Sequence, residues 1–283
     1  MKKFDLKPFI KWAGGKKRLL IELENRLPDN INEYTYYEPF IGGGALFLYL
    51  QPEKAVINDI NAELMNTWRI IKDDPEGLLS VIGKMKNTKE EYYAIRSWDR
   101  LQFWKDKKSP TERAARFIYL NKLCFNGIWR ENKSGFMNVP YSGNTKPISD
   151  LINFENIRNI SVYLNEANVK ILNCDYNRLI DEEHNYSGTF WYLDPPYADL
   201  DHRKTFDSYN ANTINNDIFH EILRDNFTIL SDNLALVMES NSNATAVREL
   251  YKDYHIDDVY LTRCIGGIGS DRKQIKELII KNY

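Results

Sequence analysis

Residues 189–193 form a short apolar run, Thr-Phe-Trp-Tyr-Leu, and Asp194-Pro195-Pro196-Tyr197 follows it directly. The run is aromatic and lies between Gly188 and two prolines, so it predicts a buried strand rather than a helix. Because two prolines continue neither a helix nor a β-ladder, the backbone must leave the sheet at Asp194 in a stiff, extended turn. A carboxylate and an aromatic ring are thereby expected at the carboxyl end of a strand, where open α/β sheets bind ligands. The same residues also suit a plain strand exit with a solvated aspartate.

Acidic residues end three further predicted strands: Glu38 after residues 34–37, Asp59 after 55–57 and Asp175 after 169–174. If these strands run parallel to 189–193, the four carboxylates lie along one edge of the sheet. A single acid at a strand end is as easily explained by a solvent-exposed side chain as by a functional one, whereas four acids at neighbouring strand ends favour a ligand-binding site. Further strands predicted at 234–238, 256–261 and 277–281, with amphipathic helices between the strands, indicate an α/β fold with a Rossmann-like sheet.

A glycine-rich turn, Gly42-Gly43-Gly44, joins the strand that ends at Glu38 to a predicted helix at 45–50. Such a unit is typical of nucleotide-binding sheets, but Phe47 occupies the position where the dinucleotide fingerprint has its third Gly or Ala. A dehydrogenase is therefore disfavoured. Asp59 suits the hydroxyls of a ribose, whereas Glu38 would repel a phosphate. The turn predicts a cofactor that carries a ribose and no pyrophosphate.

The alternation of strands and helices stops after the second strand, and residues 63–155 form a predicted insertion that is mainly helical and then rich in Asn, Gly and Pro. From Arg100 to Lys133 the chain has nine basic and three acidic residues, although its net charge is −2. A local basic excess interleaved with aromatic residues favours a nucleic-acid partner. Charge alone is explained equally well by a solvated face.

Several other classes of protein are disfavoured. The three cysteines, Cys124, Cys174 and Cys264, are widely spaced, so neither a zinc site nor a disulfide framework is predicted. No Gly-x-Ser-x-Gly or His-Glu-x-x-His motif supports a hydrolytic triad or a metal centre. No signal-peptide pattern and no apolar run of about 18 residues is present, so we expect a cytoplasmic protein with no membrane partner.

Six motifs follow one another along the chain. They are Trp12-Ala13-Gly14-Gly15-Lys16, Glu38-Pro39-Phe40-Ile41-Gly42-Gly43-Gly44, Asn58-Asp59-Ile60-Asn61, Phe125-Asn126-Gly127-Ile128-Trp129-Arg130, Phe136-Met137-Asn138-Val139-Pro140 and Asp194-Pro195-Pro196-Tyr197. In this order they resemble the motifs of Dam-type DNA adenine-N6 methyltransferases, which are alpha-group amino-methyltransferases of the D12 class. The chain departs from the family pattern at Met137, which lies where Phe-Asn-Val-Pro is expected to be contiguous.

The resemblance implies S-adenosylmethionine as the methyl donor and no metal. The implied cofactor pocket consists of Trp12, Ala13, Gly14, Gly15, Lys16, Glu38, Pro39, Phe40, Gly42, Gly43 and Gly44. Asp59 would hold the ribose hydroxyls, and Asp175 would face the amino group of the cofactor's adenine. The chemistry agrees, because this cofactor has a ribose and a sulfonium cation but no phosphate.

The resemblance also implies an adenine amine in duplex DNA as the methyl acceptor, within GATC by family analogy. The implied catalytic residues are Asp194, Pro195, Pro196 and Tyr197: the Asp194 carboxylate and the Pro195 carbonyl would accept the amine N–H bonds, and Tyr197 would stack on the flipped base. The implied DNA-binding residues are Lys11, Arg116, Lys122, Phe125, Asn126, Arg130, Asn132 and Pro140. Arg130 would read guanine and Phe125 would enter the duplex, with Arg116, Lys122 and Lys133 at phosphates. A solvated helix face fits Arg116 and Lys122 at least as well.

We therefore expect a catalytic domain of residues 1–62 and 156–283 and a DNA target-recognition domain of residues 63–155. Double-stranded DNA is the expected partner of a monomeric enzyme, and a cognate restriction endonuclease is a further candidate. The Asp-Pro-Pro-Tyr motif also occurs in cytosine-N4 enzymes, so it specifies an amine and not by itself adenine. Methylation of RNA or of a protein amide stays open. A non-catalytic DNA-binding protein is disfavoured by the intact motif.

Overall fold

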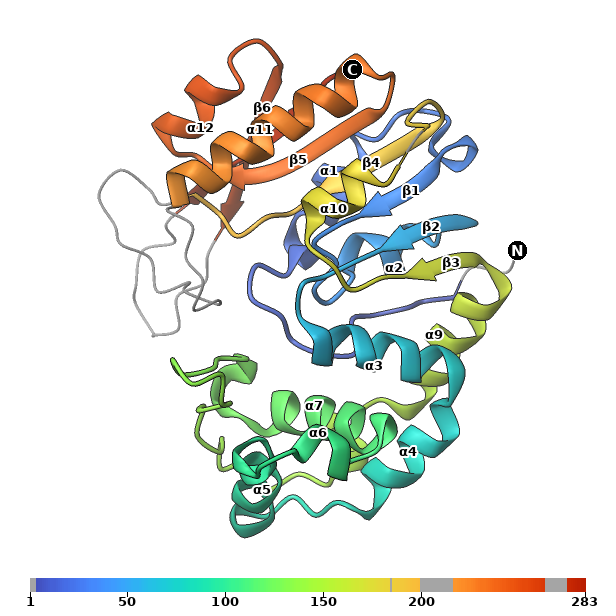
Figure 1. Ribbon diagram of the computed structural model, residues 1–283, viewed down its shortest axis with the longest axis vertical. Coiled ribbons are helices and arrows are strands. Elements are labelled where there is room, and N and C mark those ends of the chain that lie inside the picture. The colour runs from blue at the N-terminus through green and yellow to red at the C-terminus, as the bar shows by residue number, and fades with distance from the viewer. Residues whose placement is uncertain (1–3, 184, 199–215, 263–273) are drawn as a thin grey trace. The chain divides into compact units, whose positions relative to one another are not determined.

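The computed structural model describes residues 4–183, 185–198, 216–262 and 274–283 (Figure 1). Within them, seven strands form one sheet in the order β3-β2-β1-β4-β5-β7-β6. The strands are β1 (Thr35–Glu38), β2 (Lys54–Ile57), β3 (Asn168–Ile171), β4 (Thr189–Leu193), β5 (Leu236–Ser242), β6 (His255–Thr262) and β7 (Gln274–Lys281). This mixed α/β architecture confirms the fold class predicted from the sequence.

Helices connect most of the strands. The α-helices are α1 (Leu20–Glu24), α2 (Ala45–Leu50), α3 (Ala62–Asp73), α4 (Pro75–Lys84), α5 (Lys89–Arg96), α6 (Trp104–Lys107), α7 (Pro110–Leu123), α8 (Ile148–Leu151), α9 (Phe154–Glu166), α10 (Tyr176–Asp181), α11 (Asn216–Asp232) and α12 (Thr245–Leu250). Short 3₁₀ helices are η1 (Lys16–Arg18), η2 (Ile31–Glu33), η3 (Ser97–Arg100) and η4 (Phe125–Gly127). Helix α7 begins with a capping box, in which Ser109 and Glu112 each bond the other's backbone N–H, and Pro110 takes the first turn.

Strand β4 lies between β1 and β5 and pairs in parallel with both (Figure 1). All of its residues are buried, which explains a run that is apolar throughout instead of alternating. Trp191 of β4 stacks on Tyr37 of β1 with ring centroids 4.2 Å apart. The strand predicted at 189–193 is confirmed at those bounds, so Asp194 is the first residue beyond a fully buried strand.

Strand β5 is longer than the sequence predicts and is followed in the sheet by an antiparallel pair. We predicted a strand at 234–238, whereas β5 runs from Leu236 to Ser242 and includes a buried polar stretch that begins at Glu239. Strand β7 runs antiparallel to β5 on one side and to β6 on the other. Its register places Glu277 opposite Ser242 of β5. The polar end of β5 and the middle of β7 are therefore adjacent.

The chain divides into two compact units. One consists of Met1–Gly15, Ile41–Glu53 and Ile57–Cys174, and the other of Lys16–Phe40, Lys54–Val56 and Asp175–Tyr283. Residues 63–155, which we expect to be the target-recognition domain, lie wholly in the first unit. This unit has a core built on α3 and α7, where Trp68 and Phe117 are buried.

Two negative findings apply to the described parts of the chain. There, every helix is too short or too polar to cross a membrane. The same residues contain no group of three or more His, Cys, Asp or Glu side chains able to hold a metal ion. Neither Cys124 nor Cys174 forms a disulfide, and Cys264 lies outside the described residues.

Candidate active site

The turn after β4 places the Asp194 carboxylate against a buried lysine. Lys16, in η1, lies with its Nζ 2.6 Å from Asp194 Oδ1, and only 5% of the Lys16 side chain is exposed. Burial raises the pKa of Asp194, while the Lys16 ammonium and a hydrogen bond from Ser240 oppose that rise. The sequence assigned Lys16 to a cofactor pocket, and in the structure its ammonium forms an ion pair with Asp194.

Tyr197, at the end of the same turn, is held at its ring and at its hydroxyl. The Tyr197 hydroxyl donates to Glu277 Oε2 of β7 at 2.8 Å. Lys16 Nζ lies 4.5 Å from the centre of the ring, which is a cation–π distance. Burial raises the pKa of Tyr197 well above its ordinary value, and the nearby Asp194 and Glu277 carboxylates add to the rise. The phenol therefore stays protonated and can act as the donor to Glu277.

The polar end of β5 holds the chain on both sides of this turn. Ser240 Oγ donates to Asp194 Oδ1 at 2.9 Å. Asn241 Oδ1 accepts the backbone N–H of Ala198 at 3.2 Å, and Ser242 Oγ donates to the Ala198 carbonyl at 2.8 Å. The segment from Asp194 to Ala198 is thus anchored at its start and at its end by neighbouring residues of one strand.

Glu239 is the fully buried acid of the same strand. Its carboxylate accepts from Asn241 Nδ2 at 2.9 Å and from the Tyr251 hydroxyl at 2.8 Å. Burial raises the pKa of Glu239 to about 7, although these two hydrogen bonds oppose the rise. Glu239 holds the Asn241 amide, whose Oδ1 is thereby directed at Ala198.

The sequence did not single out Ser240, Asn241 or Glu277 as functional residues. One signal was present, because the apolar start of this strand is followed by four successive polar residues, Glu239, Ser240, Asn241 and Ser242. Buried polar side chains require partners, so such a run indicates a network. Glu277 gave no comparable signal, since it follows Lys276 directly and looks like a charged residue at the start of a predicted apolar strand.

The glycine turn, Trp12 and Asp59 lie together in the other unit. Gly42 has φ +46°, and a side chain there would place its Cβ 2.5 Å from Trp12 Cδ1. The Gly42 N–H donates to Asp59 Oδ2 at 3.1 Å, and Asp59 Oδ1 accepts the Asn61 N–H at 2.9 Å. The indole, the turn and the carboxylate are therefore packed against one another, and only glycine fits at Gly42.

Asp59 is a half-buried acid whose pKa is raised above its ordinary value. Burial raises its pKa to about 6, and the backbone N–H groups of Asn61 and Gly42 oppose the rise. Above that pH the carboxylate is ionised and can accept hydroxyl hydrogen bonds in addition to those that it accepts from backbone N–H groups.

The remaining residues assigned to the cofactor occupy varied surroundings. Ala13, Gly14 and Gly15 form an exposed turn in which the Gly15 N–H donates to the Trp12 carbonyl at 3.2 Å. Asp175 is exposed at the N-terminus of α10, where it accepts the Asn177 N–H at 2.9 Å.

Two buried residues and one aromatic residue complete the set. Glu38 and Pro39 are buried, and Glu38 accepts the Tyr36 hydroxyl at 2.6 Å. Phe40 packs on Tyr176 with ring centroids 5.0 Å apart. The structure thus brings Trp12, the glycine turn and Asp59 together in one unit, and Lys16, Asp194 and Tyr197 together in the other.

The residues expected to read DNA are arranged around a buried asparagine. Asn121 of α7 accepts the Lys11 N–H at 2.8 Å and donates to the Lys11 carbonyl at 2.7 Å. The same amide donates to the Gly127 carbonyl at 3.3 Å. Gly127 has φ +68°, and a Cβ there would lie 2.4 Å from Lys11 Cδ. Lys11 and the loop at residues 125–130 are therefore joined, although they are far apart in the sequence.

That loop exposes several of the expected DNA-binding side chains. Phe125 is 54% exposed, and its N–H donates to the carbonyl of Pro140, which is also exposed. Asn126 is exposed and has φ +58°, a strained conformation that asparagine tolerates better than most residues. Arg130 is exposed, and its Nε donates to Asn138 Oδ1 at 2.9 Å. The two terminal nitrogens of Arg130 remain to face a ligand.

Asn132 shapes a tight hairpin near this loop. Its Oδ1 accepts the N–H groups of Ser134 and Phe136, each at 3.0 Å. The following residue, Met137, is fully buried, and its N–H donates to Asp99 at 2.8 Å. Met137, the residue at which the chain departs from the family pattern, thus packs in the core of the first unit.

The prediction that Arg116 meets DNA phosphates is wrong for this structure. Arg116 is 2% exposed, and its guanidinium lies 2.8 Å from Asp99. It also donates to the carbonyls of Ile95 and Arg96 at 3.1 and 2.9 Å. An arginine with these partners fixes α7 against the end of α5 and is not available to a phosphate. The sequence could not reveal this, because Asp99 is 17 residues away and looks like any charged helix residue.

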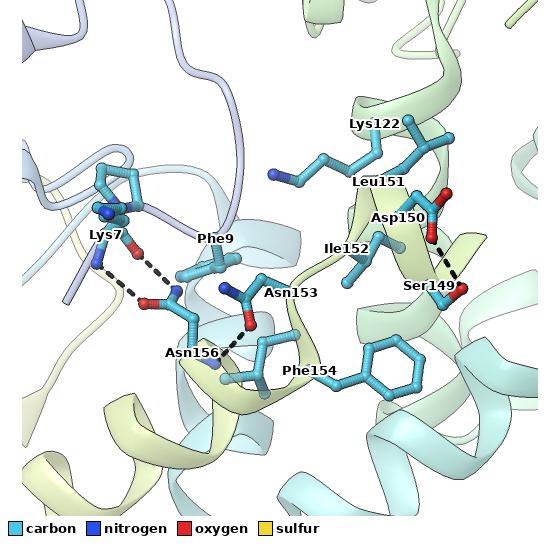
Figure 2. Close-up of a pocket in the computed structure, with 12 residues that line it drawn as sticks. Lys7, Phe9, Lys122, Ser149, Asp150, Leu151, Ile152, Asn153, Phe154 and Asn156 are labelled. Atoms are coloured by element: carbon cyan, nitrogen blue, oxygen red, sulfur yellow. Dashed lines mark hydrogen bonds between the residues drawn. The ribbon is translucent and has the colours of Figure 1, made fainter. Parts of the chain in front are cut away.

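Lys122 extends into a cavity of about 420 Å³ beside the N-terminal segment (Figure 2). Burial lowers the pKa of Lys122, and the nearby Lys11 charge lowers it further. Lys7 lines the same cavity, and its backbone N–H and carbonyl are both bonded by Asn156, at 3.0 and 2.8 Å. An anion at Lys122 would offset the burial of its charge, so the expected phosphate contact at Lys122 stays a prediction.

Comparisons with known proteins agree with one another. The family model described as D12 class N6 adenine-specific DNA methyltransferase matches residues 12–265. The chain is 41% identical to the Type II methyltransferase M1.LlaDCHI of Lactococcus lactis subsp. cremoris, over 99% of this chain and 97% of that protein. It is 35% identical to the Type II methyltransferase M.MjaIII of Methanocaldococcus jannaschii, over 99% and 100%. It is 30% identical to the DNA adenine methylase of Haemophilus influenzae, over 98% and 94%.

Proposed function

The chain belongs to the D12 class N6 adenine-specific DNA methyltransferases, and from this premise we propose that it transfers a methyl group from S-adenosylmethionine to the N6 amine of a flipped adenine in duplex DNA. The observation that carries the proposal is the Asp194 carboxylate, held at the exit of a fully buried strand by a buried lysine and a serine. A carboxylate fixed in this way suits an amine that must be oriented before it reacts.

The residues of the glycine turn fit the proposed cofactor. The Asp59 carboxylate is an acceptor suited to ribose hydroxyls, and the partly exposed Trp12 indole offers an aromatic face to a sulfonium cation. A Cβ at Gly43 would lie 3.5 Å from Trp12 Cβ, so the turn runs directly beside the Trp12 side chain. We assign Trp12, Gly42, Gly43, Gly44 and Asp59 to this pocket. When bound, S-adenosylmethionine supplies an electrophilic methyl group.

Cofactor affinity is expected to fall as the pH drops below about 6. The folded-state pKa of Asp59 is raised to about 6, so Asp59 is ionised above that pH and protonated below it. Protonation removes an acceptor for the ribose hydroxyls, and the dissociation constant should rise about tenfold per pH unit between about pH 6 and pH 5. Calorimetric titration from about pH 7.5 to pH 5 measures this change.

Two variants test the assignment of that titration. Asp59→Asn should bind the cofactor more weakly at neutral pH and should lose the dependence below pH 6. Asp181→Asn changes an exposed aspartate at the end of α10 and should keep the wild-type profile. A flat wild-type profile would show that the charge of Asp59 does not contribute to cofactor binding.

The acceptor side of the reaction uses the turn after β4. An exocyclic adenine amine is a poor nucleophile, because its lone pair is delocalised into the ring. The Asp194 carboxylate and the Pro195 carbonyl would accept its two N–H bonds, which localises the lone pair and directs it away from the protein. Asp194 then takes up the proton as the nitrogen becomes positively charged. Pro196 keeps the turn extended by fixing its own backbone.

The target base must leave the duplex, because its amine is inaccessible in a base stack. Tyr197 is proposed to stack on the extruded adenine. Its hydrogen bond to Glu277 fixes one edge of the ring before the base arrives. Phe125, exposed on its loop, is proposed to enter the vacated space with Asn126 beside it.

Arg130 is proposed to read guanine, and its loss should relax the specificity. Asn138 holds the Nε of Arg130, which leaves the terminal nitrogens for a bidentate contact to guanine O6 and N7. Arg130→Ala should reduce discrimination at one base pair by about 1–3 kcal/mol, or roughly 5- to 150-fold. Methylation rates on duplexes with single substitutions in the site measure this loss.

Lys133→Ala supplies the comparison, because Lys133 is exposed close by and is proposed to contact phosphates. It should weaken binding equally on all duplexes and lower the salt slope by about 1. Equal losses on all duplexes for Arg130→Ala as well would mean that Arg130 contacts only the backbone.

Several finer points belong to the same proposal. The target is proposed to lie within GATC, residues 63–155 to form the recognition domain, and the enzyme to act as a monomer in the cytoplasm. Lys11 and Pro140 are proposed to touch base edges, and Asp175 to face the adenine of the cofactor. A restriction endonuclease of the same specificity is a candidate partner. Sequencing the DNA of a host that expresses the chain would identify the methylated site.

Transfer of tritium from labelled S-adenosylmethionine tests the function. The purified chain is incubated with unmethylated duplex DNA, with RNA and with protein, and the DNA product is digested to nucleosides. Label in N6-methyladenine supports the proposal. Label in N4-methylcytosine, or in RNA or protein but not in DNA, would contradict the proposed methylation of adenine in DNA. Duplex binding without any transfer would favour the non-catalytic DNA-binding protein.

A further inference from the structure

Ser240 lies directly beside the reacting carboxylate. The register of β4 and β5 pairs Leu193 with Glu239, so the next residue of each strand, Asp194 and Ser240, are neighbours. Ser240 is fully buried, and its Oγ donates to Asp194 Oδ1 at 2.9 Å. A hydroxyl in this position lies on a rigid strand and has no solvent with which to exchange its hydrogen bond.

The hydrogen bonds around Ser240 have a definite direction. The Tyr192 hydroxyl lies 3.0 Å from Ser240 Oγ, and either atom could be the donor when this pair is taken alone. Ser240 has one proton, and an ionised Asp194 can only accept, so that proton points to Asp194. Tyr192 must then donate to Ser240. Burial raises the pKa of Tyr192 well above its ordinary value, which keeps its proton in place.

The two donors to Asp194 converge on one oxygen. Among the described residues, Ser240 Oγ and Lys16 Nζ both contact Oδ1, at 2.9 and 2.6 Å. Oδ2 is thereby left for an incoming amine. Resting on the function proposed above, we propose that Ser240 is a positioning residue, which with Tyr192 behind it fixes Asp194 so that Oδ2 receives the N6 amine.

The positioning role also affects the charge of the carboxylate. A hydrogen bond to the ionised form favours that form, so Ser240 helps Asp194 to stay ionised in a buried site. In the described parts of the chain, the ionisable groups that face Asp194 are Lys16 from η1, Tyr192 from β4, Tyr197 in its own turn, Glu239 from β5 and, through Tyr197, Glu277 from β7. Replacing Ser240 leaves all of these side chains in place.

The test compares Ser240→Ala with the wild-type enzyme in single turnover, so that product release does not mask the chemical step. The rate of methyl transfer should fall about 10- to 100-fold, because a hydrogen bond to a charged group is lost. The dissociation constants for DNA and S-adenosylmethionine should stay unchanged. The acidic limb of the rate profile should move to higher pH, since Asp194 becomes easier to protonate.

Ser161→Ala is the matched control. Ser161 is also buried and donates to a backbone carbonyl, that of Lys72, in the other unit. It should cost stability without moving the pH profile. A purely structural role for Ser240 predicts the same pattern for Ser240→Ala, so a folded Ser240→Ala protein with the wild-type acidic limb would overturn the proposal.

Tyr192→Phe keeps the test decisive if Ser240→Ala does not fold. It removes only the hydroxyl behind Ser240, and it should shift the acidic limb in the same direction by a smaller amount. An unmoved limb in Tyr192→Phe would also overturn the inference. The proposed function fails separately, because its failure would appear as an inactive wild-type enzyme.

Discussion

Asp194→Asn is expected to slow methyl transfer in single turnover by about 10²- to 10⁴-fold. The amide has nearly the same shape, but it cannot take up the amine proton, and one of its two positions becomes a donor that would repel an N–H bond. Binding of S-adenosylmethionine should change little, because the residues assigned to the cofactor pocket are unaltered. Rapid-quench measurement with labelled cofactor gives the rate.

The same variant should also be less stable. Lys16 is buried against Asp194, and asparagine removes the negative charge that faces its ammonium across 2.6 Å. Asp253→Asn, an exposed position after α12, should alter neither the rate nor the melting temperature. A folded Asp194→Asn protein with the wild-type rate would exclude Asp194 as the amine and proton acceptor.

Gly44→Ala is expected to lower the free energy of unfolding by about 2–5 kcal/mol. Gly44 precedes α2 with φ +66°, a conformation that strains any residue with a side chain. Its Cβ would also stand 2.8 Å from the ring of Trp68, which is fully buried and cannot move aside. Urea unfolding measures the change.

Gly83→Ala is the opposite case within the same unit. Gly83 lies inside α4, has no positive φ, and a Cβ there would meet nothing within 4 Å. Alanine should stabilise the protein by about 0.5–1 kcal/mol. If both substitutions had the same small effect, the glycine turn would not be the rigid feature described above. Trp68 also donates its indole N–H to the Gly42 carbonyl at 3.3 Å, so displacing it should weaken cofactor binding as well.

Local patterns predicted much of the fold. The strand at 189–193 could be located because its ends are chemically marked, by Gly188 and by the two prolines. The glycine-rich turn at residues 42–44 could also be located, because it lies between a predicted strand and a predicted helix. These features depend on neighbouring residues, which a sequence displays directly.

Partners distant in the chain were beyond such patterns. The predicted end of β5, at Met238, was wrong because Glu239 and Asn241 are polar residues of a kind that usually follows a buried strand. Their hydrogen bonds to Tyr251 and Ala198 could not be foreseen from the sequence. Arg116 looked like a surface cation until Asp99 was found beside it. Motif residues can be recognised from their neighbours in the sequence. Residues that hold a site in place cannot, because their partners come close only when the chain folds.

The place of β7 in the sheet has a consequence for the order of assembly. During synthesis β5 and β6 emerge first, yet in the described sheet β6 pairs only with β7 and waits for residues 274–281 before it has any neighbour. Glu277, which orients Tyr197, arrives on the same strand. A ribosome-bound chain could therefore complete the glycine turn while Tyr197, proposed to stack on the target base, still lacks its hydrogen bond to Glu277. The proposed methyl transfer should therefore begin only after β7 has been synthesised and has joined the sheet.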